Sequence, residues 1–205
     1  MEILNLINKG SLQLKNKRID SHKIDSEILL SKVLSKTREE LLVNLNQEIS
    51  SKHISNFHRF IKRRSSKEPI AYILKEKEFW SKKFLVNKNT LIPRPETELM
   101  VEKIVKIFKT KSIFILDIGT GTGCILLSIL SELKNSKGIG VDISKKAIEI
   151  ALANSKKHRL IERAKFYKKS LTEIYNSKFD LIVSNPPYIR KKDLKNLDDD
   201  IKKFE

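Results

Sequence analysis

The residues with the clearest chemical potential are Asn185-Pro186-Pro187-Tyr188, which follow the run Phe179-Asp180-Leu181-Ile182-Val183-Ser184. That run is short, β-branched near its end and stopped by two prolines, so it predicts a buried strand that ends in a rigid turn. Each proline fixes its own φ at about −65°, and Asn185 precedes a proline and is therefore kept out of the helical region. The turn would present the Asn185 side chain and the Pro186 carbonyl at the rim of a sheet.

Two hydrogen-bond acceptors at one point suit a substrate NH2 group. The lone pair of an amide or aryl amine nitrogen is delocalised, which makes that nitrogen a poor nucleophile. Accepting both N–H bonds would localise the lone pair and aim it at an electrophile, which is preorganisation rather than acid-base chemistry. We therefore predict Asn185 and Pro186 as the catalytic residues, with no metal required. A turn that only ends a strand is the alternative.

A second motif is the glycine-rich segment Gly119-Thr120-Gly121-Thr122-Gly123, between the apolar run 113–118 and the helical pattern 124–130. A strand, a glycine-rich turn and a helix form the first unit of a dinucleotide-type α/β domain. The nicotinamide fingerprint would need glycine at position 124, where Cys124 stands. The D-x-G-x-G-x-G spacing that begins at Asp117 instead brings the backbone close to an amino-acid-like tail. S-Adenosylmethionine fits this loop better than a dinucleotide does.

The following strands extend the pattern. Gly138-Ile139-Gly140-Val141-Asp142 ends in an acid that can accept hydrogen bonds from both hydroxyls of a ribose. A third strand, 164–167, precedes Ser170-Leu171, and the strand that ends at Ser184 is the fourth. Strands and helices alternate, and the connections are long enough for right-handed parallel crossovers.

Residues 1–75 contain helical patterns and almost no glycine. Apolar residues recur at spacings of three and four, and Thr37-Arg38-Glu39-Glu40 has the form of a capping box. This predicts a small bundle of helices. We interpret His53 and His58 as surface or packing residues, and Lys62-Arg63-Arg64 as a solvated helix end rather than a nucleic-acid contact.

Residues 76–92 read as a connector. Two short aromatic or β-branched runs flank Ser81-Lys82-Lys83 and predict a β-hairpin. The stretch Leu91-Ile92-Pro93-Arg94-Pro95-Glu96-Thr97-Glu98 then opens an apolar helix, with Thr97 or Glu98 in its first turn. Taken alone, this stretch is typical of an ordinary proline-rich helix entry.

Composition sets the outer limits. A chain of 205 residues that is 40% hydrophobic can bury one core and a small helical module. One cysteine, no apolar run of eighteen residues and no signal-peptide pattern predict a reduced, cytoplasmic protein without a membrane span. The net charge of +17 would attract acidic partners. The lysines are scattered along the chain rather than clustered, so we give this charge little weight as evidence for such a partner.

Together these segments resemble the protein-(glutamine-N5) methyltransferases of peptide-chain release factors, the HemK/PrmC family. The resemblance covers residues 65–205 in register, and the helical N-terminal part agrees in kind. The residues that carry it are Glu68-Pro69-Ile70-Ala71-Tyr72-Ile73, Phe79-Trp80, Ile92-Pro93-Arg94-Pro95-Glu96-Thr97-Glu98, Leu116-Asp117-Ile118-Gly119-Thr120-Gly121-Thr122-Gly123-Cys124, Val141-Asp142-Ile143-Ser144 and Phe179-Asp180-Leu181-Ile182-Val183-Ser184-Asn185-Pro186-Pro187-Tyr188-Ile189.

The resemblance implies methylation of the glutamine in the Gly-Gly-Gln loop of class 1 peptide-chain release factors, with S-adenosyl-L-methionine as donor. Neither a membrane nor a nucleic-acid substrate is expected. The implied substrate-binding residues are Asn185, Pro186, Pro187, Tyr188 and Arg94. The implied donor-binding residues are Asp117, Gly119, Thr120, Gly121, Thr122, Gly123, Asp142, Leu171 and Asn185. Ser170 and Leu171 stand where relatives carry Asp and then an aromatic residue or Leu beside the adenine.

The expected fold is α/β, with a helical substrate-docking domain at 1–75, the hairpin connector at 76–92 and a Rossmann-like methyltransferase domain at 93–205. Phe204-Glu205 resembles the start of a Phe-Glu-Pro stretch after which relatives continue through further strands, so we expect this domain to lack its last strands. Two alternatives stay open. One is an adenine-N6 methyltransferase on DNA or RNA, with Tyr188 stacked on a flipped base. The other is a non-catalytic remnant.

Overall fold

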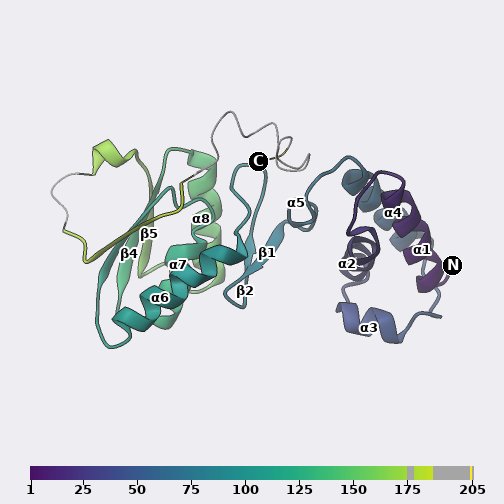
Figure 1. Ribbon diagram of the computed structural model, residues 1–205, viewed down its shortest axis with the longest axis horizontal. Coiled ribbons are helices and arrows are strands. Elements are labelled where there is room, and N and C mark those ends of the chain that lie inside the picture. Colours follow the sequence, from purple (N-terminus) through teal and green to yellow (C-terminus); the bar gives the residue numbers. More distant parts are fainter. Residues whose placement is uncertain (175–177, 187–203, 205) are drawn as a thin grey trace. The chain divides into compact units, whose positions relative to one another are not determined.

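The computed structural model describes residues 1–174, 178–186 and 204. The described residues fall into two compact units, one that comprises Met1–Leu74 and Phe204 and one that comprises the described residues from Lys75 to Pro186 (Figure 1). Each unit has its own hydrophobic core. The predicted connector at 76–92 lies within the second unit. In the described part of the chain, no helix has both the length and the apolar character needed to cross a bilayer.

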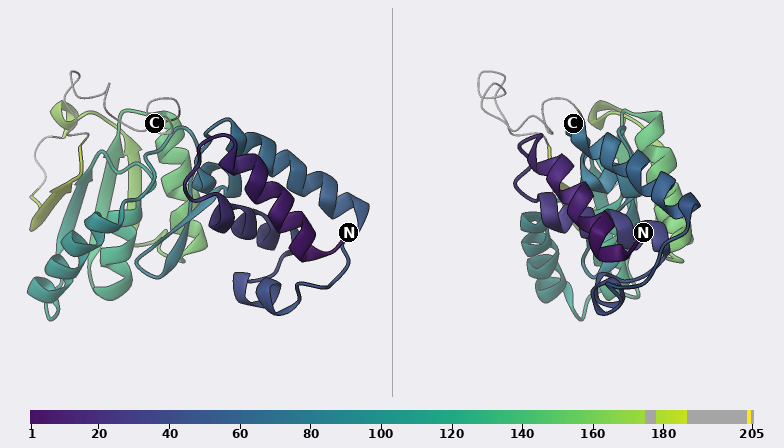
Figure 2. Two further views of the ribbon diagram at one scale, coloured as in Figure 1. Left: turned by 45° about the vertical axis from the view of Figure 1, so that its right-hand side comes forward. Right: turned by 90° about the vertical axis from the view of Figure 1, so that its right-hand side faces the viewer.

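The first unit is helical. Its described elements are α1 (Ile3–Lys15), α2 (His22–Leu34), α3 (Arg38–Val43), α4 (Ser51–Ser65) and α5 (Ile70–Leu74). Helices α1, α2 and α4 pack against one another, and the purple α1 runs along the blue α4 in Figure 2. Their interior holds Leu6, Leu30 and Phe57, each 0% exposed. The predicted capping box is present at the N-terminus of α3, where the side chains of Thr37 and Glu40 each accept the other residue's backbone N–H. The predicted helical bundle is confirmed.

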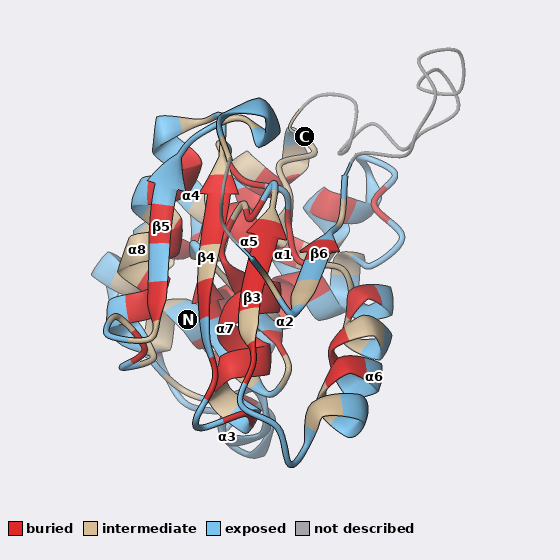
Figure 3. Cartoon of the chain, turned by 90° about the vertical axis from the view of Figure 1, so that its left-hand side faces the viewer, coloured by how far each residue is buried: buried red, intermediate tan, exposed pale blue. Residues whose placement is uncertain are grey.

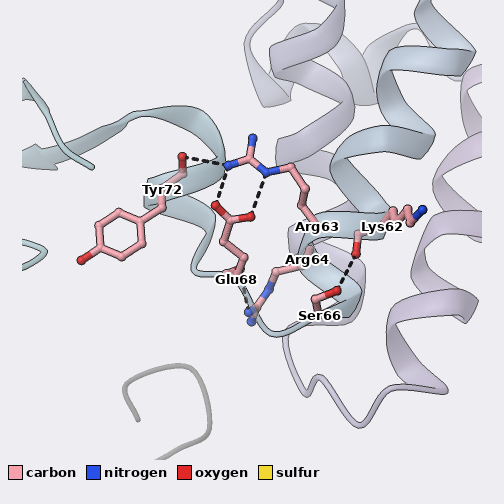
Figure 4. A network of polar contacts seen from close by, with 6 residues as sticks. All are labelled: Lys62, Arg63, Arg64, Ser66, Glu68 and Tyr72. Atoms are coloured by element: carbon pink, nitrogen blue, oxygen red, sulfur yellow. Dashed lines mark hydrogen bonds and ion pairs between the residues drawn. The ribbon is translucent and has the colours of Figure 1, made fainter. Parts of the chain in front are cut away.

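The basic run Lys62-Arg63-Arg64 is only in part the solvated helix end that the sequence suggested, because Lys62 is exposed whereas Arg63 is half-buried and Arg64 is buried. Arg64 is 7% exposed, and its Nε lies 2.7 Å from Oδ2 of Asp25 on α2. Arg63 donates from Nε and Nη2 to the two carboxylate oxygens of Glu68, at 2.8 and 2.5 Å (Figure 4). The correction has a physical reason: helix α4 turns this end toward α2 and α5, where acidic partners make burial of a guanidinium tolerable.

The second unit begins with a hairpin of two antiparallel strands, β1 (Glu76–Phe79) and β2 (Lys82–Leu85). Trp80 and Ser81 form the turn, both with φ of 52°, and this left-handed pair suits a two-residue hairpin turn. The turn is therefore one residue shorter than predicted and begins at Trp80. Its position is fixed from two sides. The Trp80 backbone N–H donates to Glu98 at 2.8 Å, and the indole N–H donates to Glu132 at 3.0 Å.

The main sheet of the second unit is parallel. Its described strands are β3 (Phe114–Ile118), β4 (Lys137–Asp142), β5 (Ala164–Lys168) and β6 (Leu181–Ser184), in the order β5-β4-β3-β6. The connecting elements are η1 (Pro95–Thr97), α6 (Glu98–Phe108), α7 (Cys124–Glu132), α8 (Lys145–Lys157) and η2 (Leu171–Glu173). Helices α7 and α8 cover one face, α6 packs beside α7, and the central strands β3 and β4 are the most buried (Figure 3). The predicted Rossmann-like α/β fold is confirmed.

The strand order determines where a ligand can approach. The chain runs outward from β3 to β4 and β5, and then crosses back to β6 on the other side of β3. In such sheets the crevice at the carboxyl ends of the strands, where the order reverses, binds the ligand. Ile118 is in register with Ser184 on one side and with Val141 on the other. The glycine loop, Asp142 and Asn185 therefore meet at one edge of the sheet.

Candidate functional site

The glycine loop after β3 forms an open cradle. Gly119, Gly121 and Gly123 all have positive φ, of 68°, 54° and 77°. A Cβ added at Gly119 would meet nothing within 4 Å, and one at Gly121 would meet only a backbone oxygen at 3.9 Å. A Cβ at Gly123 would lie 3.1 Å from the Phe166 ring. The first two glycines thus leave the backbone accessible to a ligand, whereas the third allows close packing between helix and sheet.

Asp142, at the end of β4, orients the loop. Its Oδ2 accepts the backbone N–H of Gly121 at 3.1 Å, and its Oδ1 accepts that of Ser144 at 2.9 Å. The Thr120 N–H donates to the Val141 carbonyl at 3.0 Å. A carboxylate has about four lone-pair sites, so two more acceptor positions remain for the ribose hydroxyls that the sequence predicted.

Asp117 is the buried acid of the site, with 1% exposure. Its Oδ2 accepts the Thr120 hydroxyl at 2.7 Å, while its Oδ1 has no hydrogen-bond partner of normal geometry in the part of the chain that the structure describes. Burial raises the pKa of Asp117 to about 6; the Thr120 hydroxyl and the Leu126 N–H oppose this rise, and the charge of Asp142 adds to it. A cationic group bound in the adjacent cradle would stabilise the ionised form. An amino-acid-like tail with an ammonium group meets this requirement.

Asn185 follows β6 at the same edge. Its Nδ2 donates to the hydroxyl of Thr97 at 3.2 Å, and Thr97 is 8% exposed. This bond engages the NH2 end of the amide, and Oδ1, the acceptor end, is the atom that could accept an N–H from a substrate. Pro186 is exposed, so its carbonyl lies near solvent. Pro187 and Tyr188 lie outside the described residues.

Two further predicted residues lie on segments that lead to this edge. Arg94 is half-buried and precedes η1, and its carbonyl accepts the Thr97 N–H at 3.1 Å. Leu171 begins η2 after β5 and is 59% exposed. A capping box holds η2, in which the Ser170 N–H donates to Glu173 at 2.7 Å. The proline-rich stretch thus contributes Thr97 to the site, and Leu171 is free to contact a planar ligand.

Two nearby features do not carry the chemistry. A pocket of about 100 Å³ lies on the other face of the sheet, between Leu116, Val141 and Tyr167. Ligand pockets usually have volumes of about 300 Å³ or more, so it is too small for a nucleoside-sized donor. Cys124, at the start of α7, is buried, and burial raises the pKa of its thiol to about 12. It is therefore not a nucleophile at neutral pH.

Sequence reasoning missed two polar contacts of the site. One is the Thr97 hydroxyl bond to Asn185, for which the proline-rich stretch gave no signal beyond a helix start. The other is Asn154 on α8, which bonds to the Thr122 carbonyl at 2.9 Å. A signal for Asn154 does exist: it continues the spacing of the buried Ala147 and Ala151, so it is a polar residue on an apolar stripe.

Segments of both units match known protein families. Residues 5–74 match the family model described as the PrmC N-terminal domain, and residues 95–201 match the methyltransferase small domain. The release factor glutamine methyltransferase of Buchnera aphidicola subsp. Acyrthosiphon pisum is 42% identical over 193 residues, which are 94% of this chain and 69% of that protein. The chain belongs to the release factor glutamine methyltransferase family.

The proteins that this chain resembles differ in how much of their own length the match covers. The release factor glutamine methyltransferase of Buchnera aphidicola subsp. Baizongia pistaciae is 40% identical, with coverage of 98% of this chain and 72% of that protein. The bifunctional methyltransferase of Rickettsia typhi is 39% identical, but the match covers 91% of this chain and 40% of that protein.

Among solved structures, the ribosomal protein L11 methylase of Lactobacillus delbrueckii subsp. bulgaricus is 25% identical over 45% of this chain and 47% of that one, with a TM-score of 0.39.

Proposed function

We propose that this chain methylates the side-chain amide nitrogen of the glutamine in the Gly-Gly-Gln loop of class 1 peptide-chain release factors, with S-adenosylmethionine as donor. Membership of the release factor glutamine methyltransferase family supports the reaction class. The observation that carries the proposal is the orientation of Asn185, whose NH2 group is engaged by Thr97 so that Oδ1 can accept. An acceptor at that point suits an amide NH2 and would repel a carboxylate substrate.

One set of residues at this edge of the sheet would bind the donor, and another would bind the glutamine amide. Gly119 and Gly121 offer open backbone to the amino-acid tail of the donor, and Asp142 offers acceptors to its ribose. When bound, S-adenosylmethionine supplies an electrophilic methyl carbon on a sulfonium. Asn185 Oδ1 and the Pro186 carbonyl accept the two N–H groups of the glutamine amide, which localises the nitrogen lone pair and orients it.

The test is transfer of labelled methyl groups to a purified release factor by the wild-type chain and by variants. Asn185→Ala should lower kcat by about 100-fold or more, the scale seen when one preorganised hydrogen-bonding group is removed from an active site. Thr97→Val should lower kcat about tenfold, because the Asn185 amide keeps its chemistry but loses one orienting hydrogen bond. Thr110→Val, the same change at an exposed residue, is the matched control and should leave kcat unchanged.

Two results would reject the proposal. Equal transfer by wild type and Asn185→Ala would remove Asn185 from the chemistry. Methylation of adenine in DNA or RNA, with none of the release factor, would assign the same turn to an exocyclic amine instead.

A further inference from the structure

Asn154 is a buried amide whose side chain joins three backbone groups. It lies on α8 with 0% exposure. Its Oδ1 accepts the Leu85 N–H at 2.7 Å, and its Nδ2 donates to the Leu85 carbonyl at 3.0 Å and to the Thr122 carbonyl at 2.9 Å. The partners fix the orientation of the amide, because one N–H needs an acceptor and two carbonyls need donors.

Two of these bonds extend the hairpin. Leu85 is the last residue of β2, and Asn154 takes both its N–H and its C=O, as a neighbouring strand would. The next residue, Val86, donates its N–H to the Lys75 carbonyl at 3.2 Å, so the hairpin continues to pair on its other side. Asn154 thus joins the edge of β2 that does not pair with β1 to helix α8.

The third bond reaches the glycine loop. Thr120 and Gly121 are held by their N–H groups on the β4 side, at the Val141 carbonyl and the Asp142 carboxylate. The Thr122 carbonyl is held from the α8 side, by Asn154. Three successive residues of the loop are therefore fixed from two directions, and Asn154 supplies the second direction.

We propose that Asn154 is a positioning residue for donor binding. Its side chain holds the glycine loop in the conformation that leaves the backbone of Gly119 and Gly121 accessible, and it links this loop to the β1–β2 hairpin. The inference rests on the proposed function in that S-adenosylmethionine is the donor. Without Asn154, the Thr122 carbonyl would lose its buried partner and the loop would relax to satisfy it elsewhere. The backbone at Gly119 and Gly121 would then lose the geometry that receives the donor.

A residue with a purely structural role would lower stability and leave donor affinity intact, so the experiment needs a second variant that loses the same number of side-chain bonds to the backbone away from the loop. Arg163 provides it. Its guanidinium donates to three backbone carbonyls, those of Leu130, Leu133 and Ser136, at 2.8, 3.0 and 3.0 Å. This site lies where α7 ends and β4 begins, at the opposite edge of the sheet from the glycine loop. Arg163→Met is therefore matched to Asn154→Leu in the number of bonds lost.

Calorimetric titration with S-adenosylhomocysteine is performed on wild type, Asn154→Leu and Arg163→Met, together with thermal unfolding. We expect both variants to have lower melting temperatures. Only Asn154→Leu should weaken binding, by at least tenfold, while Arg163→Met stays within twofold of wild type. An unchanged Kd in Asn154→Leu, or equal weakening in both variants, would overturn the role of Asn154.

Hydrogen exchange on the wild-type chain tests the same link without any variant that must fold. Saturating S-adenosylhomocysteine should slow exchange of the Leu85 N–H, because ordering the loop also orders the amide that accepts this proton. The N–H of Val86, which bonds to the Lys75 carbonyl on the other side of the same hairpin, is the internal reference and should change less. Protection confined to the glycine loop would overturn the link to the hairpin. A wild-type chain that binds no S-adenosylhomocysteine would instead reject the proposed function, and this inference with it.

Discussion

At the scale of the residue, the burial of the Asp117 carboxylate costs free energy of folding. The carboxyl is buried next to the loop, its Oδ1 has no hydrogen-bond partner of normal geometry among the described residues, and burial raises its pKa to about 6. Its pKa in the unfolded chain is about 4. The native state therefore binds the proton more tightly than the unfolded state does. Stability is lost as the pH rises from 4 to 6, and the full loss persists above pH 6.

This cost can be measured with Asp117→Asn, which keeps the shape of the side chain and removes its titration. We expect wild type to lose about 2–2.5 kcal/mol of unfolding free energy relative to the variant between pH 4 and pH 7.5, because the carboxyl of the unfolded chain is already about half ionised at pH 4. Urea unfolding followed by the fluorescence of Trp80, the single tryptophan, measures the second unit at both pH values. A difference between the two proteins that is the same at both pH values would mean that Asp117 does not titrate in this range.

At the scale of the element, the sequence predicted each strand of the main sheet because each pattern is local. The glycines after Ile118, the acid that ends β4 and the prolines after Ser184 mark strand ends by turn chemistry alone. The contacts that sequence reasoning missed are long-range. Thr97 and Asn185 are far apart in the chain, as are Asp25 and Arg64, and no local pattern encodes their pairing. A basic run at a helix end predicts a solvated surface unless the partner helix is known.

The Asp25–Arg64 pair gives an element-scale prediction for the packing of α2 on α4. Arg64→Met removes one partner and leaves the other carboxylate buried, which typically costs about 3–5 kcal/mol. The double variant Asp25→Leu/Arg64→Met should recover most of that loss, since no buried charge remains. Lys62→Met, at an exposed position two residues earlier on α4, is the control and should change stability by less than about 0.5 kcal/mol. Urea unfolding followed by far-ultraviolet circular dichroism measures all three, and a double variant no more stable than Arg64→Met would contradict the account.

At the scale of the whole molecule, the two cores contain different residues. Leu6, Leu30 and Phe57 belong to the helical core, whereas Ile115, Leu126 and the other residues of the α/β core lie beyond Leu74. A unit with its own core can unfold as its own cooperative transition. The donor-binding residues proposed above all lie in the second unit. Donor binding should therefore stabilise that unit alone.

The last prediction separates the two transitions. Trp80 lies in the second unit, so its fluorescence follows that unit, whereas circular dichroism at helical wavelengths follows both. S-Adenosylhomocysteine at 100 times its Kd should stabilise the transition seen by Trp80 by about 2.7 kcal/mol and leave the remaining dichroism transition in place. Arg64→Met should have its effect on the other unit. It should lower the urea midpoint of the dichroism transition of the helical unit, while the transition seen by Trp80 fluorescence stays as in wild type. If both changes move one shared transition, the two cores unfold together, and the free energy of donor binding is distributed over the whole chain.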